Sequence, residues 1–245
     1  QNRTDGFRTA APETGLAEAF VRMQLQRGPQ ELGEKAFKLY VKTVDKAFIL
    51  YAEHDFNAST FTGRVIASTM SDMHSAVCGA VGALKGPLHG GANEAAMNML
   101  SDIMDAVQGG STPREWLDNA FLTKRKLMGF GHRVYKSGDH RAGILREWGL
   151  RYAQEENPDA KRWFDLGDEV QKIMLDDKNI HPNVDYPCGM TYYAMGIPVP
   201  QYTPIFVASR ITGWCAHIME QHQHNRIIRP LAEYTGPELK QWNDD

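Results

Sequence analysis

Apolar side chains recur along this chain at the spacing of an α-helix, with polar residues between them. The clearest pattern predicts an amphipathic helix near residues 34–52. Its apolar face consists of Phe37, Tyr40, Val41, Val44, Ala47 and Phe48. The same spacing returns after Asn93 and predicts a second helix, which Gly109 and Gly110 end.

Start signals and periodicity predict three further helices. Thr112 is followed by Pro113 and by Glu115, an arrangement typical of a capped helix start. Apolar residues at helical spacing predict another helix around Leu166 to Met174, and Thr203 opens a long one that runs towards Gln221. No alternating apolar run is bounded by turns. The pattern therefore predicts an all-α fold, with candidate chemistry on the loops between helices.

Composition limits the classes of function. The chain has 245 residues, 42% hydrophobic and 23% charged, which is typical of a globular protein. Its net charge of -3 and scattered basic residues give no reason to expect nucleic acid, and no apolar run is long enough to cross a bilayer. Three distant cysteines favour a reducing compartment. We expect a cytoplasmic protein, with the mitochondrial matrix as an alternative.

Three short segments place ionisable side chains among glycines or prolines. They are residues 86–93, with His89; residues 129–133, with His132; and residues 181–187, with Asp185. An aspartate can take a proton from carbon beside a carbonyl group, while one histidine stabilises the oxygen that gains charge and another polarises an electrophilic carbonyl. Arginines would bind the carboxylates of such an electrophile.

These segments resemble the citrate synthase family, including the 2-methylcitrate synthases. The matching stretches run in family order from about residue 45 to the end. They are residues 54–60, 86–93, 129–133 with Asp139 and Arg141, 178–185, 209–210 and 225–230. The resemblance implies an all-α fold with a large and a small domain that close over substrates in a cleft.

The resemblance also implies a role for each matching residue. Asp185 would take a proton from the methyl group of acetyl-CoA, His89 would stabilise the enolate, and His132 would donate a proton to the keto oxygen of oxaloacetate. Hydrolysis of the thioester would give citrate and CoA. The oxaloacetate carboxylates would be bound by His54, Arg141, Arg210 and Arg229, the last from the neighbouring subunit of a homodimer.

The residues expected to bind CoA match the family less strongly. The resemblance implies CoA-binding roles for Leu127, Gly129, Gly131, Lys178 and Asn183. It calls for no metal or redox cofactor. The expected partners are further copies of the chain, as a homodimer or a higher oligomer, and the two substrates, with no nucleic acid and no membrane. Propionyl-CoA, which would give 2-methylcitrate, stays open as the alternative acyl donor, because a pocket distinguishes one methylene by only ~1–3 kcal/mol.

The resemblance divides the chain into four parts. Residues 1–45 match no motif securely, and residues 46–95 carry large-domain helices and the first catalytic loop. Residues 96–200 form mostly the small domain, and residues 201–245 form a large-domain helix and a tail that crosses to the partner. Family members carry a longer N-terminal region, so a natural short form, a fragment and an incomplete sequence all stay open.

Two other classes of function remain as alternatives. His217, His222 and His224 raise the hypothesis of a metal-dependent hydrolase, but their spacing does not place three imidazoles on one helical face. A non-catalytic relative of the family is the second alternative. It is disfavoured by the presence of Asp185 together with both histidines.

Overall fold

The computed structural model describes residues 14–23, 26 and 28–238, and these residues form helices joined by loops. The α-helices are α1 Leu16–Met23, α2 Pro29–Leu32, α3 Glu34–Tyr51, α4 Ala58–Ala67, α5 Met73–Leu84, α6 Ala92–Gln108, α7 Pro113–Leu122, α8 His140–Glu156, α9 Lys161–Lys178, α10 Asp185–Ala194 and α11 Tyr202–Gln223. Short 3-10 turns lie at Pro158–Ala160 and Val199–Gln201. No strand is assigned within the described ranges, where the β-type pairing is an isolated bridge between Phe130 and Pro182. The predicted all-α class is confirmed.

The helices predicted from periodicity correspond to α3, α6, α7, α9 and α11. The expected start of α7 is present: the Thr112 side chain accepts from the Glu115 N–H, and the Glu115 carboxylate accepts from the Thr112 N–H. Gly109 is the C-terminal cap of α6. Part of the N-terminal stretch that matched no motif, residues 1–13, lies outside the described residues.

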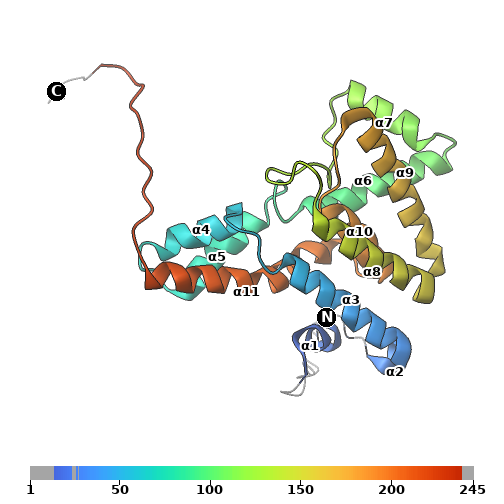
Figure 1. The fold of residues 1–245 in the computed structure, drawn as a ribbon, viewed down its shortest axis with the longest axis horizontal. Coiled ribbons are helices and arrows are strands. Elements are labelled where there is room, and N and C mark those ends of the chain that lie inside the picture. The colour runs from blue at the N-terminus through green and yellow to red at the C-terminus, as the bar shows by residue number, and fades with distance from the viewer. Residues whose placement is uncertain (1–13, 24–25, 27, 239–245) are drawn as a thin grey trace, which may run out of the picture.

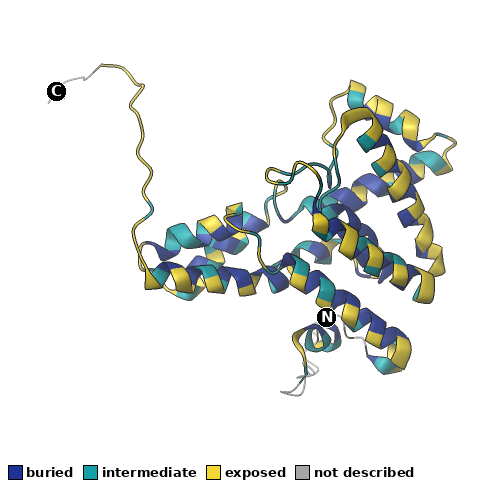
Figure 2. Ribbon diagram, viewed as in Figure 1, coloured by how far each residue is buried: buried dark blue, intermediate teal, exposed yellow. Residues whose placement is uncertain are grey.

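The helices gather in two lobes (Figure 1). In one lobe α4 and α5 pack on each other and on α11. In the other, α6 to α10 pack together, and α3 and α11 run between the two groups. Helix faces turned inward are buried and those turned outward are exposed (Figure 2). None of the helices in the described ranges is long and apolar enough to cross a membrane.

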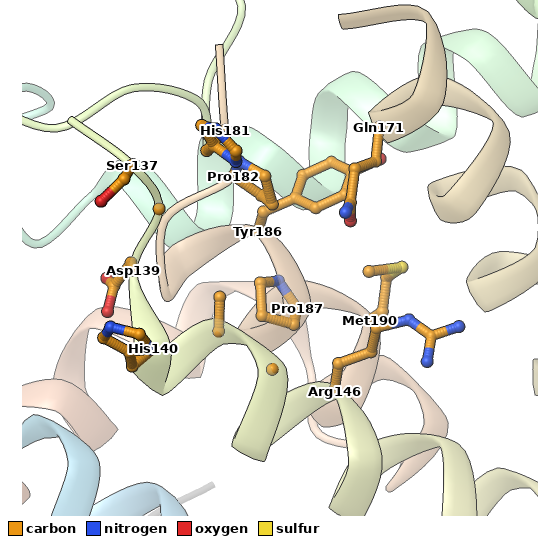
Figure 3. A pocket seen from close by; sticks show the side chains of 13 residues that line it. Ser137, Asp139, His140, Arg146, Gln171, His181, Pro182, Tyr186, Pro187 and Met190 are labelled. Carbon is orange, nitrogen blue, oxygen red and sulfur yellow. The ribbon is translucent and has the colours of Figure 1, made fainter. Parts of the chain in front are cut away.

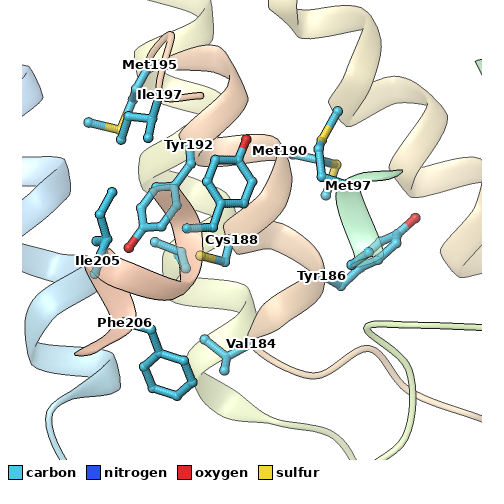
Figure 4. Packing of buried hydrophobic residues seen from close by; sticks show 14 of the residues in the cluster. Met97, Val184, Tyr186, Cys188, Met190, Tyr192, Met195, Ile197, Ile205 and Phe206 are labelled. Carbon is cyan, nitrogen blue, oxygen red and sulfur yellow. The ribbon is translucent and has the colours of Figure 1, made fainter. Parts of the chain in front are cut away.

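Helix α10 packs against α6, α8 and α9 in the second lobe, and Figure 4 shows the packing of its buried side chains. Eight of its ten residues are buried, so the helix has almost no polar face. Glycines let its neighbours approach closely: a Cβ on Gly149 of α8 would lie 2.0 Å from the Thr191 hydroxyl oxygen, and one on Gly167 of α9 would lie 2.5 Å from the Met190 sulfur. Because α10 is held on all sides, the residue that begins it is fixed in position.

Candidate active site

A polar cavity of about 110 Å³ opens where the two lobes meet. It brings together six of the residues predicted from sequence to act on the substrates, together with Asn183 from the predicted CoA side. The cavity is lined by Tyr51, His54, Asn57, His89, His132, Arg141, Asn183, Val184, Asp185, Phe206 and Arg210. They come from the end of α3, the loops that follow α3, α5 and α7, the start of α8, the start of α10, and α11.

Asp185 was expected on a loop, but it is the first residue of α10. Proline two residues later is compatible with a first helical turn, where the missing N–H has no intrahelical partner. Three hydrogen bonds fix this helix start. The Asn183 side chain accepts from the Asp185 N–H at 3.0 Å, Asp139 Oδ2 accepts from the Val184 N–H at 3.0 Å, and the Tyr51 hydroxyl donates to Asp185 Oδ1 at 2.7 Å.

The pKa of the Asp185 carboxyl group suits the role of a base. Burial raises its pKa to about 6, and the Tyr51 hydroxyl, Arg141 and Arg210 limit that rise by favouring the charged form. A carboxylate with this pKa is mostly ionised at pH 7, yet it holds a proton more strongly than an exposed aspartate. It can therefore remove a weakly acidic proton and carry it for the rest of a reaction.

His89 is neutral, and the start of α4 fixes its tautomer. The Ser59 backbone N–H, one of the donors left unpaired in the first turn of α4, lies 3.3 Å from His89 Nε2. A backbone N–H can only donate, so Nε2 accepts and the ring proton lies on Nδ1. Burial, followed by Arg210 and His54, lowers the pKa of His89 to about 4. The helix start disfavours a cation in the same way.

His132 has the opposite tautomer. Its Nδ1 accepts from the backbone N–H groups of Val134 at 3.1 Å and Tyr135 at 3.2 Å, so the proton of the neutral ring lies on Nε2. Burial and then the Arg141 charge lower the pKa of His132. The cavity is thus lined by two neutral imidazoles, each held from behind and each with one N–H left to donate.

Arg141 is oriented by a carboxylate. Its Nε and Nη2 donate to the two oxygens of Asp139 at 3.0 and 2.8 Å, and Asp139 is 6% exposed. The Arg141 Nη1 group is directed towards the Leu50 carbonyl at a long 3.4 Å. Asp139 thereby holds both Arg141 and the start of α10, which couples a candidate substrate-binding residue to the candidate base.

Arg210 is a buried cation that forms no ion pair with the described residues, although Glu53 and Asp185 act on its charge from nearby. It is 2% exposed, its Nε donates to the Tyr51 carbonyl at 2.5 Å, and its guanidinium lies over the Phe206 ring. Nη1 has no hydrogen-bond partner in the described part of the chain. Burial and then Arg141 lower the pKa of Arg210 to about 10. A buried guanidinium with a free N–H is energetically favourable only when an anion pairs with it.

His54 completes the cavity on the side of His132. Its Nε2 lies 2.9 Å from the Tyr135 hydroxyl, and its ring centroid lies 5.1 Å from that of His132. Burial and then Arg141 lower its pKa, so it too is neutral near pH 7. The ring can hydrogen-bond a bound oxygen without adding a charge.

A wide cleft of about 970 Å³ adjoins the polar cavity, and His54, Asn57, His89, His132, Asn183 and Asp185 line both. Four of the five predicted CoA-side residues line the cleft: Leu127, Gly129, Gly131 and Asn183. Gly129 and Gly131 have φ of 82° and 76°, a region that favours glycine, and they shape the loop before His132. Exposed apolar side chains such as Leu88 also line the cleft.

Two predicted site residues lie outside both cavities. The Lys178 ammonium lies 4.3 Å from the centroid of the Phe121 ring, away from the cleft lining. Arg229 is exposed in the extended segment after α11, which runs away from the lobes (Figure 1). The three histidines of the metal hypothesis are also apart from the cavity: His217 contacts Glu53 and Arg64, and His222 contacts the Ser71 carbonyl.

The sequence patterns missed the residues that orient the candidate catalytic groups. Tyr51 reads as part of the apolar face of α3, yet its hydroxyl reaches Asp185. Trp214 reads as core of α11, yet its indole N–H donates to the Ser59 hydroxyl beneath His89. The position of Tyr51 in the sequence could have indicated this role, because Tyr51 lies one helical turn before His54, at the helix end that opens into the cavity.

The family model for the C-terminal domain of citrate synthase matches residues 1–231 of this chain. The chain belongs to the citrate synthase family. The match also includes the N-terminal stretch in which no motif was recognised, and it confirms the family resemblance found in the sequence.

Members of the citrate synthase family with different substrates resemble the chain to a similar degree. A 2-methylcitrate synthase of Shewanella oneidensis is 48% identical over 83% of this chain, and a citrate synthase of Mycolicibacterium smegmatis is 44% identical over 96%. A citrate synthase of Thermoplasma acidophilum, solved as a ternary complex with carboxymethyl coenzyme A and oxaloacetate, superimposes with a TM-score of 0.82 at 36% identity over 95% of this chain.

These citrate synthase relatives are longer than the chain. The matches span 53% of the Shewanella protein, 60% of the Mycolicibacterium protein and 60% of the Thermoplasma chain. The chain thus spans little more than half of the length of the relatives that it matches.

Proposed function

We propose that this protein condenses a short acyl-CoA with oxaloacetate and water to give a tricarboxylate and free CoA. Acetyl-CoA, which would give citrate, is the first candidate for the acyl donor. The observation that carries the proposal is the content of the polar cavity. One raised-pKa carboxyl group, two neutral imidazoles with opposite tautomers and two guanidinium groups line the same small space.

The first step is formation of a carbon nucleophile. Asp185 takes a proton from the acyl carbon next to the thioester carbonyl, and the electron pair moves onto the carbonyl oxygen. The free Nδ1–H of His89 donates to that oxygen and stabilises its negative charge. A neutral imidazole can play this role, because its N–H can donate a hydrogen bond to the developing oxyanion without an added positive charge.

The second step is attack on the keto carbon of oxaloacetate. Arg210 and Arg141 bind the carboxylates, His54 donates to a bound oxygen, and the Nε2–H of His132 polarises the keto group. As the carbon–carbon bond forms, His132 gives its proton to the new alkoxide. Water then attacks the thioester carbonyl and gives one proton to the deprotonated His132, and the CoA thiolate leaves with the proton that Asp185 took from carbon. The new carboxylic acid then releases its proton to solvent. Each step uses side chains of this chain, so the proposal requires no metal or redox cofactor.

The wide cleft supports the assignment of the acyl-CoA. It opens onto Asp185 and His89 from outside, and it is lined by backbone and apolar groups suited to a long pantetheine arm. The Thermoplasma relative was solved with a CoA derivative and oxaloacetate together, which supports the same pair of ligands here. Asn183, Leu127, Gly129 and Gly131 would contact the CoA, with Lys178 as a weaker candidate.

The identity of the acyl donor is tested by the ratio of kcat/KM for acetyl-CoA and propionyl-CoA. CoA release is measured with oxaloacetate and either acetyl-CoA or propionyl-CoA, and kcat/KM is compared. A higher value for acetyl-CoA supports a citrate synthase, and a higher value for propionyl-CoA supports a 2-methylcitrate synthase, the alternative favoured by the 48% identical relative. No oxaloacetate-dependent CoA release with either donor, from protein that is folded, would reject the proposed function.

We infer further that the active protein is a homodimer and that Arg229 binds substrate in the neighbouring subunit. The inference rests on the matching segment at residues 225–230 and on the exposure of Arg229, which leaves it free to reach another chain. It predicts complementation: Arg229→Ala subunits mixed with Asp185→Asn subunits should form heterodimers with one intact site. Random mixing then restores up to about a quarter of the wild-type activity, since half of the dimers are hybrid and half of their sites are intact. A mixture no more active than its parents, with subunit exchange confirmed, rejects the shared site.

Two coarser assignments follow the same reasoning. Residues 46–95 and 201–245 would belong to a large domain and residues 96–200 to a small one, in line with the two lobes (Figure 1). A cytoplasmic location is supported by Cys78, Cys188 and Cys215, none of which is in a disulfide.

A further inference from the structure

A second cavity, here called the α8 cavity, opens at the surface of the lobe of α6–α10, where Ser137, His140 and Gly143 of its lining are exposed. Its volume is about 330 Å³, and small-molecule sites occupy roughly 300–1,000 Å³. It shares no lining residue with the polar cavity or the wide cleft. Its walls come from residues 137–139, the first turns of α8, the middle of α9, residues 181–182 and α10 (Figure 3).

One side of the α8 cavity is polar. The side chains of Ser137, His140, Gln171 and His181 line it, and they make no hydrogen bond within the described part of the chain. The Arg146 guanidinium is held in place by Asp168. The carboxyl group in the lining, Asp139, already accepts from Arg141 and from the Val184 N–H. The lining thus offers two imidazoles with unpaired ring nitrogens and a guanidinium whose charge is paired with Asp168, and these groups can donate hydrogen bonds to an anion.

Another part of the lining of the α8 cavity is apolar and partly flat. It is formed by the Tyr186 ring, Pro182, Pro187 and Met190 (Figure 3). The Tyr186 hydroxyl donates to the Gly167 carbonyl at 2.9 Å, which fixes the ring. A flat, fixed apolar wall suits a planar or aliphatic body rather than a bare inorganic ion.

Gly143 lines the α8 cavity at an exposed position of α8. Within α8, a Cβ added to Gly149 would meet Thr191, so that glycine permits helix packing; a Cβ added to Gly143 would meet nothing within 4 Å. A glycine inside a helix destabilises it by about 1 kcal/mol relative to alanine. Close packing does not explain Gly143, whereas the space that it leaves adjoins the cavity.

We propose that the α8 cavity binds a small organic anion, with an apolar body against Tyr186 and a carboxylate or phosphate group near His140 and His181. Both parts of the lining adjoin, in the sequence, residues that line the polar cavity. Residues 137–139 lead to Arg141, and Tyr186 and Pro187 directly follow Asp185. Occupancy therefore alters the position of Arg141 and Asp185 through Asp139, which contacts both segments. This regulatory part rests on the proposed function, whereas the binding part does not.

Binding can be tested without any activity. Protein carrying ¹³C-methyl methionine is titrated with phenyl phosphate, with benzoate and with neutral benzyl alcohol, and the Met190 signal is assigned from Met190→Leu. We expect saturable shifts of Met190 with at least one of the two anions, at a Kd of about 1 mM or tighter. Met128 lines the wide cleft and reports binding there instead. The two anions distinguish a phosphate from a carboxylate ligand.

Substitution at Gly143 provides the matched control. Gly143→Leu should fill the cavity and abolish the Met190 shift, while Gly143→Ala adds helix propensity with little volume and should keep most of it. Failure of both anions to shift Met190, an equal response to benzyl alcohol, or an unchanged response in Gly143→Leu overturns the binding site.

The effect of the bound anion on activity is tested separately, by steady-state kinetics. The same anion at saturation should change KM for oxaloacetate or kcat by at least about 3-fold in the parent protein and leave Gly143→Leu unchanged. Binding with no change in either constant, in protein that is active, overturns regulation and leaves the site. Inactive protein that still binds the anion counts against the proposed function and not against the site.

Discussion

The polar cavity and the wide cleft meet at the same residues but are built in opposite ways. In the polar cavity each reactive side chain is fixed from behind: Asp185 by Tyr51, His132 by two backbone N–H groups, and Arg141 by Asp139. The cleft is lined largely by loop backbone and by exposed side chains such as Leu88, which is 80% exposed. Rigid polar groups suit bond making, whereas an open apolar wall suits binding of a long substrate arm.

This difference predicts how substitutions in the two regions divide between chemistry and binding. Substitutions in the polar cavity should change kcat or the binding of oxaloacetate. Substitutions of residues that line only the cleft should change only the binding of the acyl-CoA. The largest effect is expected at the base. Asp185→Asn should lower kcat by about 10³–10⁴-fold, because the amide cannot accept the proton from carbon.

The control for Asp185→Asn is binding of oxaloacetate, measured by calorimetry. The variant keeps a hydrogen-bond acceptor for the Tyr51 hydroxyl and should bind the dicarboxylate with near wild-type affinity. Turnover within 10-fold of wild type would remove Asp185 from the role of base.

The next largest effect is expected at Arg210. Arg210→Leu removes a buried guanidinium whose Nη1 has no hydrogen-bond partner in the described chain. Oxaloacetate should therefore bind about 100-fold more weakly, a loss of ~2.7 kcal/mol of binding free energy. Binding of a CoA derivative should change little. Arg151→Leu, at an arginine exposed on α8 and paired within its own helix, is the matched control. An unchanged affinity for oxaloacetate would make Arg210 a structural residue.

A smaller effect is expected at Tyr51. The Tyr51 hydroxyl lowers the pKa of Asp185, so Tyr51→Phe should move the acid limb of the rate to higher pH and reduce kcat by about 10-fold at pH 7. KM for oxaloacetate should stay close to wild type. Tyr202→Phe, which removes a buried hydroxyl that donates to the Gly189 carbonyl, serves as the control for general loss of packing. An equal shift of the acid limb in both variants would exclude a specific role for Tyr51.

The smallest effect is expected in the cleft. Leu88→Ala should raise KM for the acyl-CoA by about 3-fold, because one exposed apolar contact is lost, and should leave kcat unchanged. Leu122→Ala is a suitable control, since Leu122 is similarly exposed at 82% on α7 and does not line the cleft. A large loss of kcat in Leu88→Ala would contradict the division between the two regions.

The sequence patterns predicted the amphipathic helices and the candidate residues that the fold brings together in the polar cavity, but not what orients these residues. Helix α3 shows a clear periodicity because one face is buried, whereas α10 has almost no polar face and gave no such signal. Glycine and proline marked the segments of His89, His132 and Asp185. The pairing of Tyr51 with Asp185 joins residues far apart in sequence, and the tautomer of each histidine depends on a neighbour that only the fold supplies. The α8 cavity arises from four separate segments and leaves no local pattern.

The most direct test of the account is the ionisation of the base. With both substrates far below KM, the rate of CoA release reports ionisations of the free enzyme. Burial raises the pKa of Asp185 to about 6, so the rate should fall as pH drops through about 6, when the carboxylate is protonated. His89, with its pKa lowered to about 4, should add no break above pH 5. We predict one acid limb near pH 6; a rate that stays constant down to pH 4.5 would contradict a buried Asp185 acting as the base.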